Sequence, residues 1–157
     1  MLKKIFVALI AIWTSSCQQQ QAGSANFDKT KIAEEIRKVN TSIYEAGNDK
    51  NPAKLYSHFS DKVTGVFDGA VMGSWDEHKK EGKAFFGSQK EIKYTIDSIY
   101  SIDVISNEVS VLTGTYSLSA IDTLGNGINT SHAWTYVFNK QNGDWKVVHF
   151  HQSTKPK

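Results

Sequence analysis

Apolar side chains between residues 32 and 46 recur at steps of three and four, the spacing that puts them on one face of a helix. The residues that follow this spacing are Ile32, Ile36, Val39, Ile43 and Ala46. They predict an amphipathic helix over 28–47, with Asp28 as its N-cap. Asn51 followed by Pro52 is a typical helix start and predicts a second, short helix over 52–59.

A third helix is predicted further along the chain. Ser74 and Glu77 have the spacing of a capping box, which predicts a helix that begins there and runs to about Phe86. On this helix we expect Trp75 to belong to the core or to a lid. We expect His78, on the same helix, to face the solvent.

Strand patterns occupy the rest of the chain, in segments rich in β-branched and aromatic residues. The predicted strands cover 62–67, 70–72, 91–105, 108–121, 127–139 and 144–154. The short connections between the long strands contain Gly, Asn and Ser, which predicts antiparallel hairpins. Helices followed by long strands predict an α+β fold, in which a curved antiparallel sheet wraps around the N-terminal helices and leaves a cavity in a cone.

Alternation along the strands divides their side chains between the two faces of the sheet. We expect one face to line the cone, with the candidate pocket residues Tyr116, His132, Trp134, Tyr136, Phe150 and Gln152. Trp145, His149 and His151 fall together on the opposite face. Both faces of this strand are largely apolar or aromatic, so we expect the outer one to meet a partner, most simply a second copy of the chain.

The N-terminus has the features of an export signal. Two lysines precede a nine-residue apolar run over 5–13, and small residues follow it. This run is too short to span a bilayer, which needs about 20 residues. The sole cysteine, Cys17, stands at the expected cleavage point, so the segment 1–17 resembles a bacterial lipoprotein signal in which this cysteine carries the lipid. Ordinary secretion with cleavage near 23–25 is the alternative.

A lipid at Cys17 would anchor the protein firmly in the bacterial cell envelope, on a periplasmic or outer-membrane face. Residues 18–26 are polar and small, and they predict a flexible tether. The sequence shows no internal repeat and no second linker. We therefore expect 27–157 to form one domain.

Composition and charge narrow the class of protein. The chain of 157 residues is 39% hydrophobic and 22% charged, as in globular domains. Without the two lysines of the signal, the basic residues equal the 16 acidic ones, which argues against a nucleic-acid partner. A single cysteine excludes an intramolecular disulfide and a cysteine-rich zinc site. No nucleotide-binding, zinc-hydrolase or serine-nucleophile motif is present, so we expect no cofactor.

Two stretches of the chain resemble a known superfamily. The sequence NPAKLYSHFSDKV over 51–63 resembles the second helix and first strand of the NTF2-like superfamily, also called SnoaL-like or ketosteroid-isomerase-like. The sequence GDWKVVHFHQS over 143–153 resembles the last strand of the association domain of calcium/calmodulin-dependent kinase II and of its bacterial SnoaL-like relatives. The resemblance implies a cone-shaped, cystatin-like α+β fold that is usually a dimer through the convex face of its sheet. It implies no particular reaction, because this fold hosts many functions.

The resemblance also bears on the cavity. In the kinase association domain, arginines point into the cone and bind small anions, and the matching positions here are Tyr116, Tyr136 and Gln152. Because none of these is arginine, an anion site does not carry over. Aromatic rings with hydroxyl groups take its place, which favours a neutral or apolar ligand.

An enzyme of the isomerase or dehydratase kind is an alternative. In the isomerase branch of the superfamily, an acid at the end of the first strand is the general base, and inward hydroxyl or carboxyl groups form an oxyanion hole. The resemblance implies Asp68 as the base, with Tyr44 or Tyr116 donating to the developing charge. Asp68 also precedes Gly69, so an ordinary turn residue is the competing interpretation.

A non-catalytic dimerisation or interaction module is the third hypothesis. Its cone would be filled by its own side chains, and its convex face would act through Trp145, His149 and His151. The two histidines are two residues apart on a strand, as in some metal sites, but no third ligand of matching spacing follows, so we expect no metal. His132 either lines the mouth of the cone or lies exposed at the start of its strand.

Overall fold

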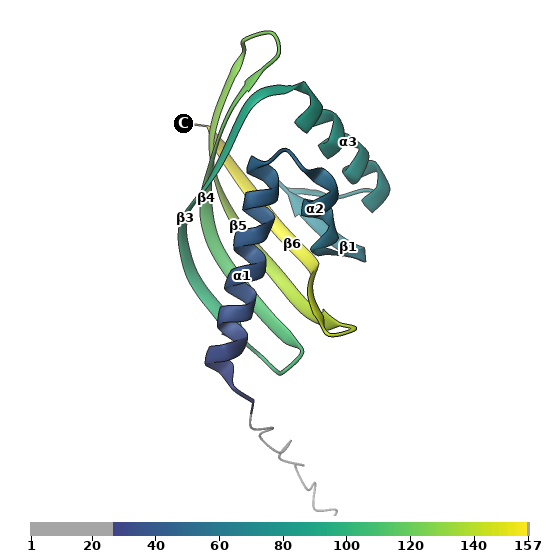
Figure 1. Ribbon diagram of the computed structural model, residues 1–157, viewed down its shortest axis with the longest axis vertical. Coiled ribbons are helices and arrows are strands. Elements are labelled where there is room, and N and C mark those ends of the chain that lie inside the picture. Colours follow the sequence, from purple (N-terminus) through teal and green to yellow (C-terminus); the bar gives the residue numbers. More distant parts are fainter. Residues whose placement is uncertain (1–26, 157) are drawn as a thin grey trace, which may run out of the picture.

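The computed structural model describes residues 27–156 (Figure 1). The predicted lipoprotein signal over 1–17, its Cys17 and the predicted tether over 18–26 lie outside these residues. Within them, two helices precede the first strand and a third helix separates the two halves of the sheet. None of the helices in this part of the chain is long and apolar enough to cross a membrane.

All three predicted helices are present, and the local sequence explains where they begin. They are α1 Lys29–Asn48, α2 Pro52–Ser57 and α3 Trp75–Ser88. At the start of α1, the Asp28 carboxylate accepts a hydrogen bond from the backbone N–H of Lys31 at 2.9 Å. At the start of α3, Ser74 and Glu77 form the predicted capping box, in which each side chain accepts a hydrogen bond from the other residue's backbone N–H.

One six-stranded sheet accounts for the remaining regular structure of residues 27–156. Its strands are β1 Phe59–Phe67, β2 Ala70–Val71, β3 Gln89–Val104, β4 Val109–Asp122, β5 Gly127–Gln141 and β6 Asp144–Pro156. Their order across the sheet is β2-β1-β6-β5-β4-β3. The predicted hairpins are antiparallel, and the turn at Asp68 and Gly69 has the positive φ values of 48° and 86° that a tight two-residue hairpin requires.

The last strand joins the two halves of the sheet. β6 lies between β5 and β1 and runs parallel to β1, with Phe150 opposite Gly65. A Cβ on Gly65 would collide with the Phe150 ring, so glycine permits this close approach. The sequence patterns do not predict the parallel pairing, because no turn connects two strands that are this far apart along the chain.

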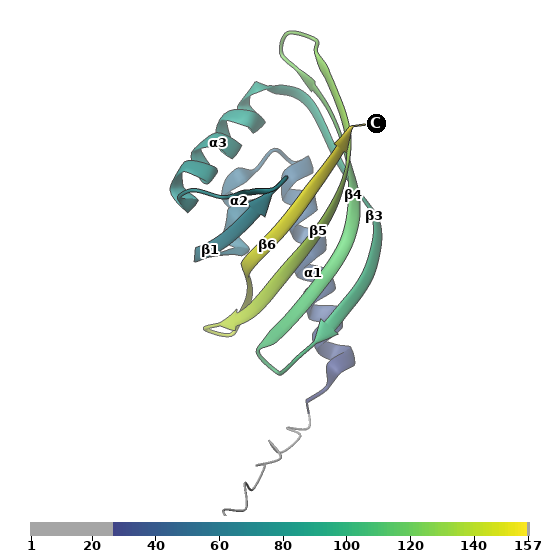
Figure 2. The same ribbon diagram turned by 180° about the vertical axis from the view of Figure 1, so that it is seen from behind.

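All three helices lie on one side of the sheet (Figure 1). The sheet is curved and unclosed, with α1 across its concave face and with α2 and α3 beside β1. Seen from behind, the convex face carries no helix (Figure 2). The predicted α+β architecture of a curved sheet around the N-terminal helices is therefore confirmed.

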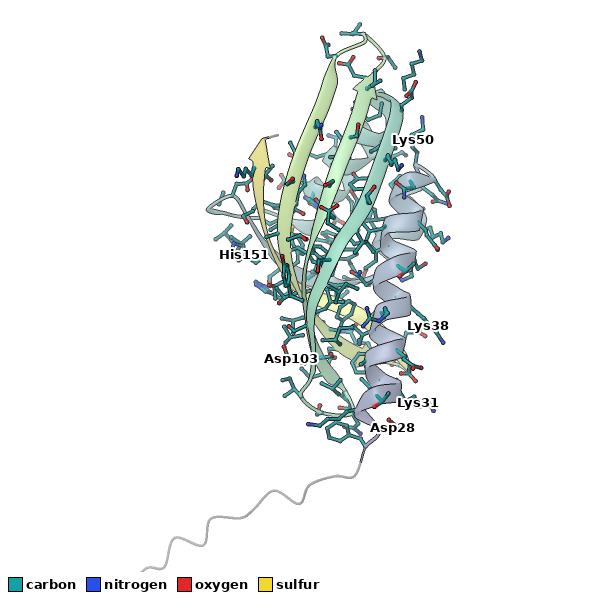
Figure 3. All side chains as sticks on the ribbon, turned by 90° about the vertical axis from the view of Figure 1, so that its left-hand side faces the viewer. Asp28, Lys31, Lys38, Lys50, Asp103 and His151 are labelled. Atoms are coloured by element: carbon teal, nitrogen blue, oxygen red, sulfur yellow. The ribbon has the colours of Figure 1, made fainter. Side chains whose placement is uncertain are left out.

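The hydrophobic core fills the layer between α1 and the concave face. Ile36 from the helix and Leu112, Trp134 and Phe138 from the sheet are each at most 2% exposed. Figure 3 shows side chains packed throughout this layer, whereas Lys38 points away from it into the solvent. Because the apolar stripe of α1 meets an apolar sheet face, burial of this surface holds the two layers together.

A β-bulge interrupts the alternation of β6. Val137 of β5 lies opposite His149, but the next residue of β5, Phe138, lies opposite Val147. Val148 is therefore an extra residue on β6 with no partner of its own. A bulge of one residue exchanges the two faces, so side chains before Val148 and after it follow opposite patterns.

Because of the bulge, the convex face differs from the predicted outer surface at Trp145. Trp145 lies in the core on the concave side, 6% exposed, and its Nε1 donates a hydrogen bond to Glu35 Oε2 of α1 at 2.9 Å. The prediction that Trp145 shares a face with His149 and His151 is wrong, because it assumed uninterrupted alternation. Only the two histidines face the convex side.

We expect Gly114→Ala to destabilise the fold by about 1–3 kcal/mol, the usual cost of overpacking a core. A Cβ at Gly114 would lie 2.6 Å from the backbone oxygen of Ser98 and 2.6 Å from the Trp134 ring. Gly87→Ala on α3 is the matched control, because its Cβ would meet no atom within 4 Å and alanine favours a helix. Urea denaturation midpoints of both variants, each compared with that of the wild type, measure the two effects. An unchanged midpoint for Gly114→Ala would contradict this packing.

Candidate functional site

A cavity of about 350 Å³ lies between the helices and the concave face of the sheet. The second half of α1, the short helix α2 and helix α3 line one side, and every strand except β2 contributes to the other. Most of the lining side chains are aromatic, and Glu81 is the sole charged one among those that the structure describes. Volume and lining are those of a site for a small molecule.

Five of the six predicted pocket residues line this cavity: Tyr116, His132, Tyr136, Phe150 and Gln152. The candidate donor Tyr44 also lines it. Trp134 is the exception, because it does not line the cavity. It is 2% exposed, and its ring packs 5.4 Å from the Tyr44 ring in the layer beneath the cavity. An inward position on a strand was not sufficient to reach the cavity, because α1 covers this part of the sheet.

His132 organises the polar end of the cavity. Its Nδ1 lies 3.3 Å from Gln152 Nε2 and 3.1 Å from Thr154 Oγ1, and its Nε2 lies 2.7 Å from Thr130 Oγ1. The imidazole stacks on the Tyr116 ring with centroids 4.3 Å apart. Tyr116 in turn donates its hydroxyl proton to Gln152 Oε1 at 2.9 Å. His132 is thus held on its face and at both nitrogens.

These contacts determine where the His132 proton lies. Because Gln152 accepts from Tyr116 with its oxygen, it presents an N–H to His132 Nδ1, which must then act as an acceptor. The proton of a neutral His132 therefore resides on Nε2 and is donated to Thr130. Burial lowers the pKa of His132, and the nearby Asp68 carboxylate opposes this in part. His132 is a neutral residue with both nitrogens occupied.

His78 also belongs to the candidate site. The prediction that it faces the solvent is wrong. It is half-buried, lines the cavity, and stacks on Trp75 and Phe67 with centroid distances of 5.4 Å and 5.1 Å. Neither of its nitrogens hydrogen-bonds to another residue within 27–156. Burial lowers the pKa of His78, and Glu81 opposes this in part. The available signal was its spacing of three from Trp75, which places both on one helix face.

Four tyrosines bring neutral hydroxyl groups to the cavity from α1, β3, β4 and β5: Tyr44, Tyr94, Tyr116 and Tyr136. Burial raises the pKa of each of them, to about 12 for Tyr136, so all four stay protonated at physiological pH. The cavity therefore offers hydrogen-bonding groups without offering a charge. A neutral ligand with one or two polar groups matches this lining.

Asp68 lies exposed in the turn between β1 and β2. Its Oδ1 accepts a hydrogen bond from the backbone N–H of Thr154 at 2.6 Å and so ties the turn to the end of β6. Asp68 is not among the residues that line the cavity. The arrangement is that of a structural turn residue, the competing interpretation of this position.

The convex face carries the two predicted histidines of the last strand. His149 Nδ1 is hydrogen-bonded to Thr64 Oγ1 at 2.8 Å, and His151 is exposed on the side of the sheet away from α1 (Figure 3). No group of three or more His, Cys, Asp or Glu side chains within 27–156 is placed to hold a metal. Small uncharged side chains cover the centre of this face: Val111, Thr113, Thr115, Ala133, Thr135 and Val137.

A family model of the calcium/calmodulin dependent protein kinase II association domain matches residues 32–156. The chain belongs to this family. The match covers all the strands and almost all of α1, so the matched residues include those that line the cavity. A comparison with curated proteins finds no match.

Several solved structures, some of them named as NTF2-like, have the same fold as this association domain. A Xanthomonas campestris protein named for a proposed association domain of this kind is 18% identical, with a TM-score of 0.62 over 85% of this chain and 92% of its own. An NTF2-like protein from Streptomyces avermitilis, named for a proposed dehydratase activity, is 17% identical, with a TM-score of 0.70 over 83% of this chain and 100% of its own. An NTF2-like superfamily protein from Salmonella enterica is 16% identical, with a TM-score of 0.72 over 83% and 95%. These likenesses show a shared fold.

We expect the stability of the association domain to fall as the pH is lowered from about 7.5 to about 5. Burial lowers the pKa of His58, His78 and His132 in the folded chain, below the value of about 6.5 for an unfolded histidine. Below that pH the unfolded state binds more protons than the folded state, so the free energy of unfolding decreases with falling pH. Urea denaturation across this range measures the effect.

The control for this experiment is His58→Gln, which removes one of the three histidines at a position outside the cavity lining. This variant should show a shallower dependence of stability on pH than the wild type. A free energy of unfolding that stays constant over the whole range would contradict the neutral, buried state of these histidines.

Proposed function

We propose that this association domain binds a small, mostly apolar molecule in the cavity between its helices and the concave face of its sheet. The observation that carries the proposal is the cavity itself, about 350 Å³ in volume and lined mainly by aromatic rings. Pockets of about 300–1,000 Å³ with apolar walls and a few convergent polar groups are typical of small-molecule sites. An interaction module with a fully packed interior would lack such a space.

The lining favours a ligand without a formal charge. Neither lysine nor arginine is among the described residues that line the cavity, and the tyrosines and His132 are held neutral by burial. An ion in such surroundings would lose its hydration without gaining a counter-charge, which is costly. The proposal therefore excludes the small anions that the arginines of the kinase association domain bind, as the resemblance at Tyr116, Tyr136 and Gln152 already implied.

Leu55→Trp is expected to weaken binding of an aromatic probe, 2-methoxynaphthalene, by about tenfold or more, because the indole would occupy part of the cavity that Leu55 lines. Leu124→Trp is the matched control, since Leu124 is 86% exposed and does not line the cavity. Isothermal titration calorimetry on the wild type and both variants measures the dissociation constants. Failure of the folded wild type to bind the probe, or equal binding by Leu55→Trp, would count against the proposal.

An isomerase- or dehydratase-type enzyme remains the alternative function, and the proposed activity of the Streptomyces avermitilis relative is of this kind. The version with Asp68 as general base has no geometric support, because this carboxylate is exposed and bonded to the backbone of β6. A general base must come within hydrogen-bonding reach of the proton that it takes. Ligand binding is therefore the function that the geometry supports best.

We further propose that the chain forms a homodimer through the convex face of its sheet. The association-domain family suggests oligomerisation, and the convex face carries no helix (Figure 2). The centre of the face presents small, uncharged side chains, among them Thr113 and Thr135, whose hydroxyl oxygens lie 3.3 Å apart. An interface centre with small, uncharged side chains suits a two-fold pairing of identical surfaces.

Thr135→Arg is expected to convert the dimer to a monomer, because it would bury an unpaired charge at the centre of the interface. Thr41→Arg, on the exposed side of α1, is the matched control and should leave the dimer intact. Native mass spectrometry of the purified wild type and both variants reports the subunit number. A monomeric wild type, or a dimeric Thr135→Arg variant, would argue against this interface.

We also propose that the domain is held in the bacterial cell envelope by a lipid on Cys17, with 18–26 as the tether and 27–157 as the single domain. The support is the pattern of a charged start, a short apolar run and small residues before the sole cysteine. On this proposal the partners of the protein are a neutral ligand, a second copy of the chain and the membrane that carries the lipid, without nucleic acid.

A further inference from the structure

The cavity holds two histidines, and they differ in what their nitrogens contact. Both nitrogens of His132 are occupied by Gln152, Thr154 and Thr130. Neither nitrogen of His78 has a hydrogen-bond partner within residues 27–156. A polar group with unused hydrogen-bonding capacity in an apolar site is a recognition point for a ligand, because the ligand supplies the partner that the protein does not.

The surroundings of His78 leave only its edge available. The imidazole is nearly parallel to the rings of Trp75 and Phe67, at interplanar angles of 18° and 26°. The Tyr56 and Phe150 rings lie 6.2 Å and 6.0 Å away. Since imidazole nitrogens form hydrogen bonds in the plane of the ring, a partner must approach His78 at its edge. The aromatic neighbours hold the ring in place for such a partner.

Tyr116 and Gln152 direct hydrogen-bond donors at their own neighbours in the protein. Tyr116 gives its only hydroxyl proton to Gln152 Oε1, and Gln152 turns its amide group to His132. Tyr116 Oη therefore keeps its lone pairs but has no proton left for a ligand. Tyr116 and a neutral His78 thus each offer an acceptor in a cavity in which the hydroxyls of Tyr44, Tyr94 and Tyr136 can both donate and accept. A ligand that donates a hydrogen bond complements it.

We propose that the cavity takes a neutral aromatic compound bearing a hydroxyl group, and that His78 receives this hydroxyl as the specificity-determining residue. This inference rests on the proposed function and names the class of ligand. The aromatic walls favour a flat ring system, which packs against their faces and edges. A hydroxyl fits a neutral imidazole with either nitrogen protonated, because it both donates and accepts.

Acidification should release such a ligand. Protonation of His78 would convert its acceptor nitrogen to a donor and place a cation among aromatic rings. Around His78, Glu81 on α3 favours the protonated form, whereas burial against α2, β1 and β6 opposes it, and Tyr56 on α2 stays neutral. Burial is the larger effect and lowers the pKa of His78, so His78 is neutral at pH 7.

The experiment compares 2-naphthol with 2-methoxynaphthalene, in which a methyl group replaces the hydroxyl proton. Calorimetric titration of the full-length wild type near pH 7.5 should show about tenfold tighter binding of 2-naphthol, as expected for one buried hydrogen bond. Near pH 5 this preference should shrink to about twofold or less. Both probes stay uncharged over this range, so the change reports on the protein.

Variants of His78 separate its role from simple packing. His78→Phe keeps an aromatic ring between Trp75 and Phe67 and should bind both probes with equal affinity at both pH values. His78→Gln keeps a hydrogen-bonding group that does not titrate, so it should retain part of the preference and lose the pH dependence. His58→Gln, outside the cavity lining, should behave like the wild type.

The outcomes distinguish this inference from the proposed function. Equal affinity of the wild type for both probes overturns the role of His78 and leaves ligand binding standing. An unchanged preference in His78→Phe also overturns it. Absence of binding by both probes to the folded wild type overturns the proposed function and the inference together. The wild-type comparison needs no variant, so it decides the question even where a substitution at position 78 impairs folding.

Discussion

The packing of one straight helix against a curved sheet is the constraint on which the cavity depends. Ile32 and Ile36 in the first half of α1 belong to the closed core, whereas Tyr44 and Gly47 near its end line the open space. A straight rod touches a curved surface over only part of its length, so space remains where the two diverge. α2 and α3 cover this space from the side (Figure 1), and their aromatic residues supply the rest of the wall.

Burial in that wall selects the uncharged form of every titratable ring. It lowers the pKa of His78 and His132 and raises the pKa of Tyr116 and Tyr136, and both directions lead to neutral side chains. The same physical cause acts on anything that enters. On the proposed function, the loss of hydration would select against charged molecules, and hydrogen bonds to the lining would distinguish among neutral ones.

Local signals in the sequence were sufficient for most of the fold. The capping box at Ser74 and the tight turn at Asp68 specify backbone geometry with a few adjacent residues, and regular alternation carried five pocket residues to the correct face. The failures are non-local. The bulge at Val148, which moves Trp145 into the core, depends on register against β5. His78 shares a face of α3 with Trp75, but the packing of that face against Phe67 of β1 is a contact between distant segments. The sequence of a single strand or helix does not predict which distant segment packs against it.

β6 is the last strand to be synthesised, yet it lies in the interior of the sheet. Its contact with β1 joins residues 85 positions apart, as between Thr64 and His149, and pairing over such separations is slow. β1 has no long partner until β6 arrives, and Phe150 and Gln152 reach the cavity wall only then. The sheet therefore cannot enclose β1 before β6 has been synthesised, and until then the cavity lacks part of its wall.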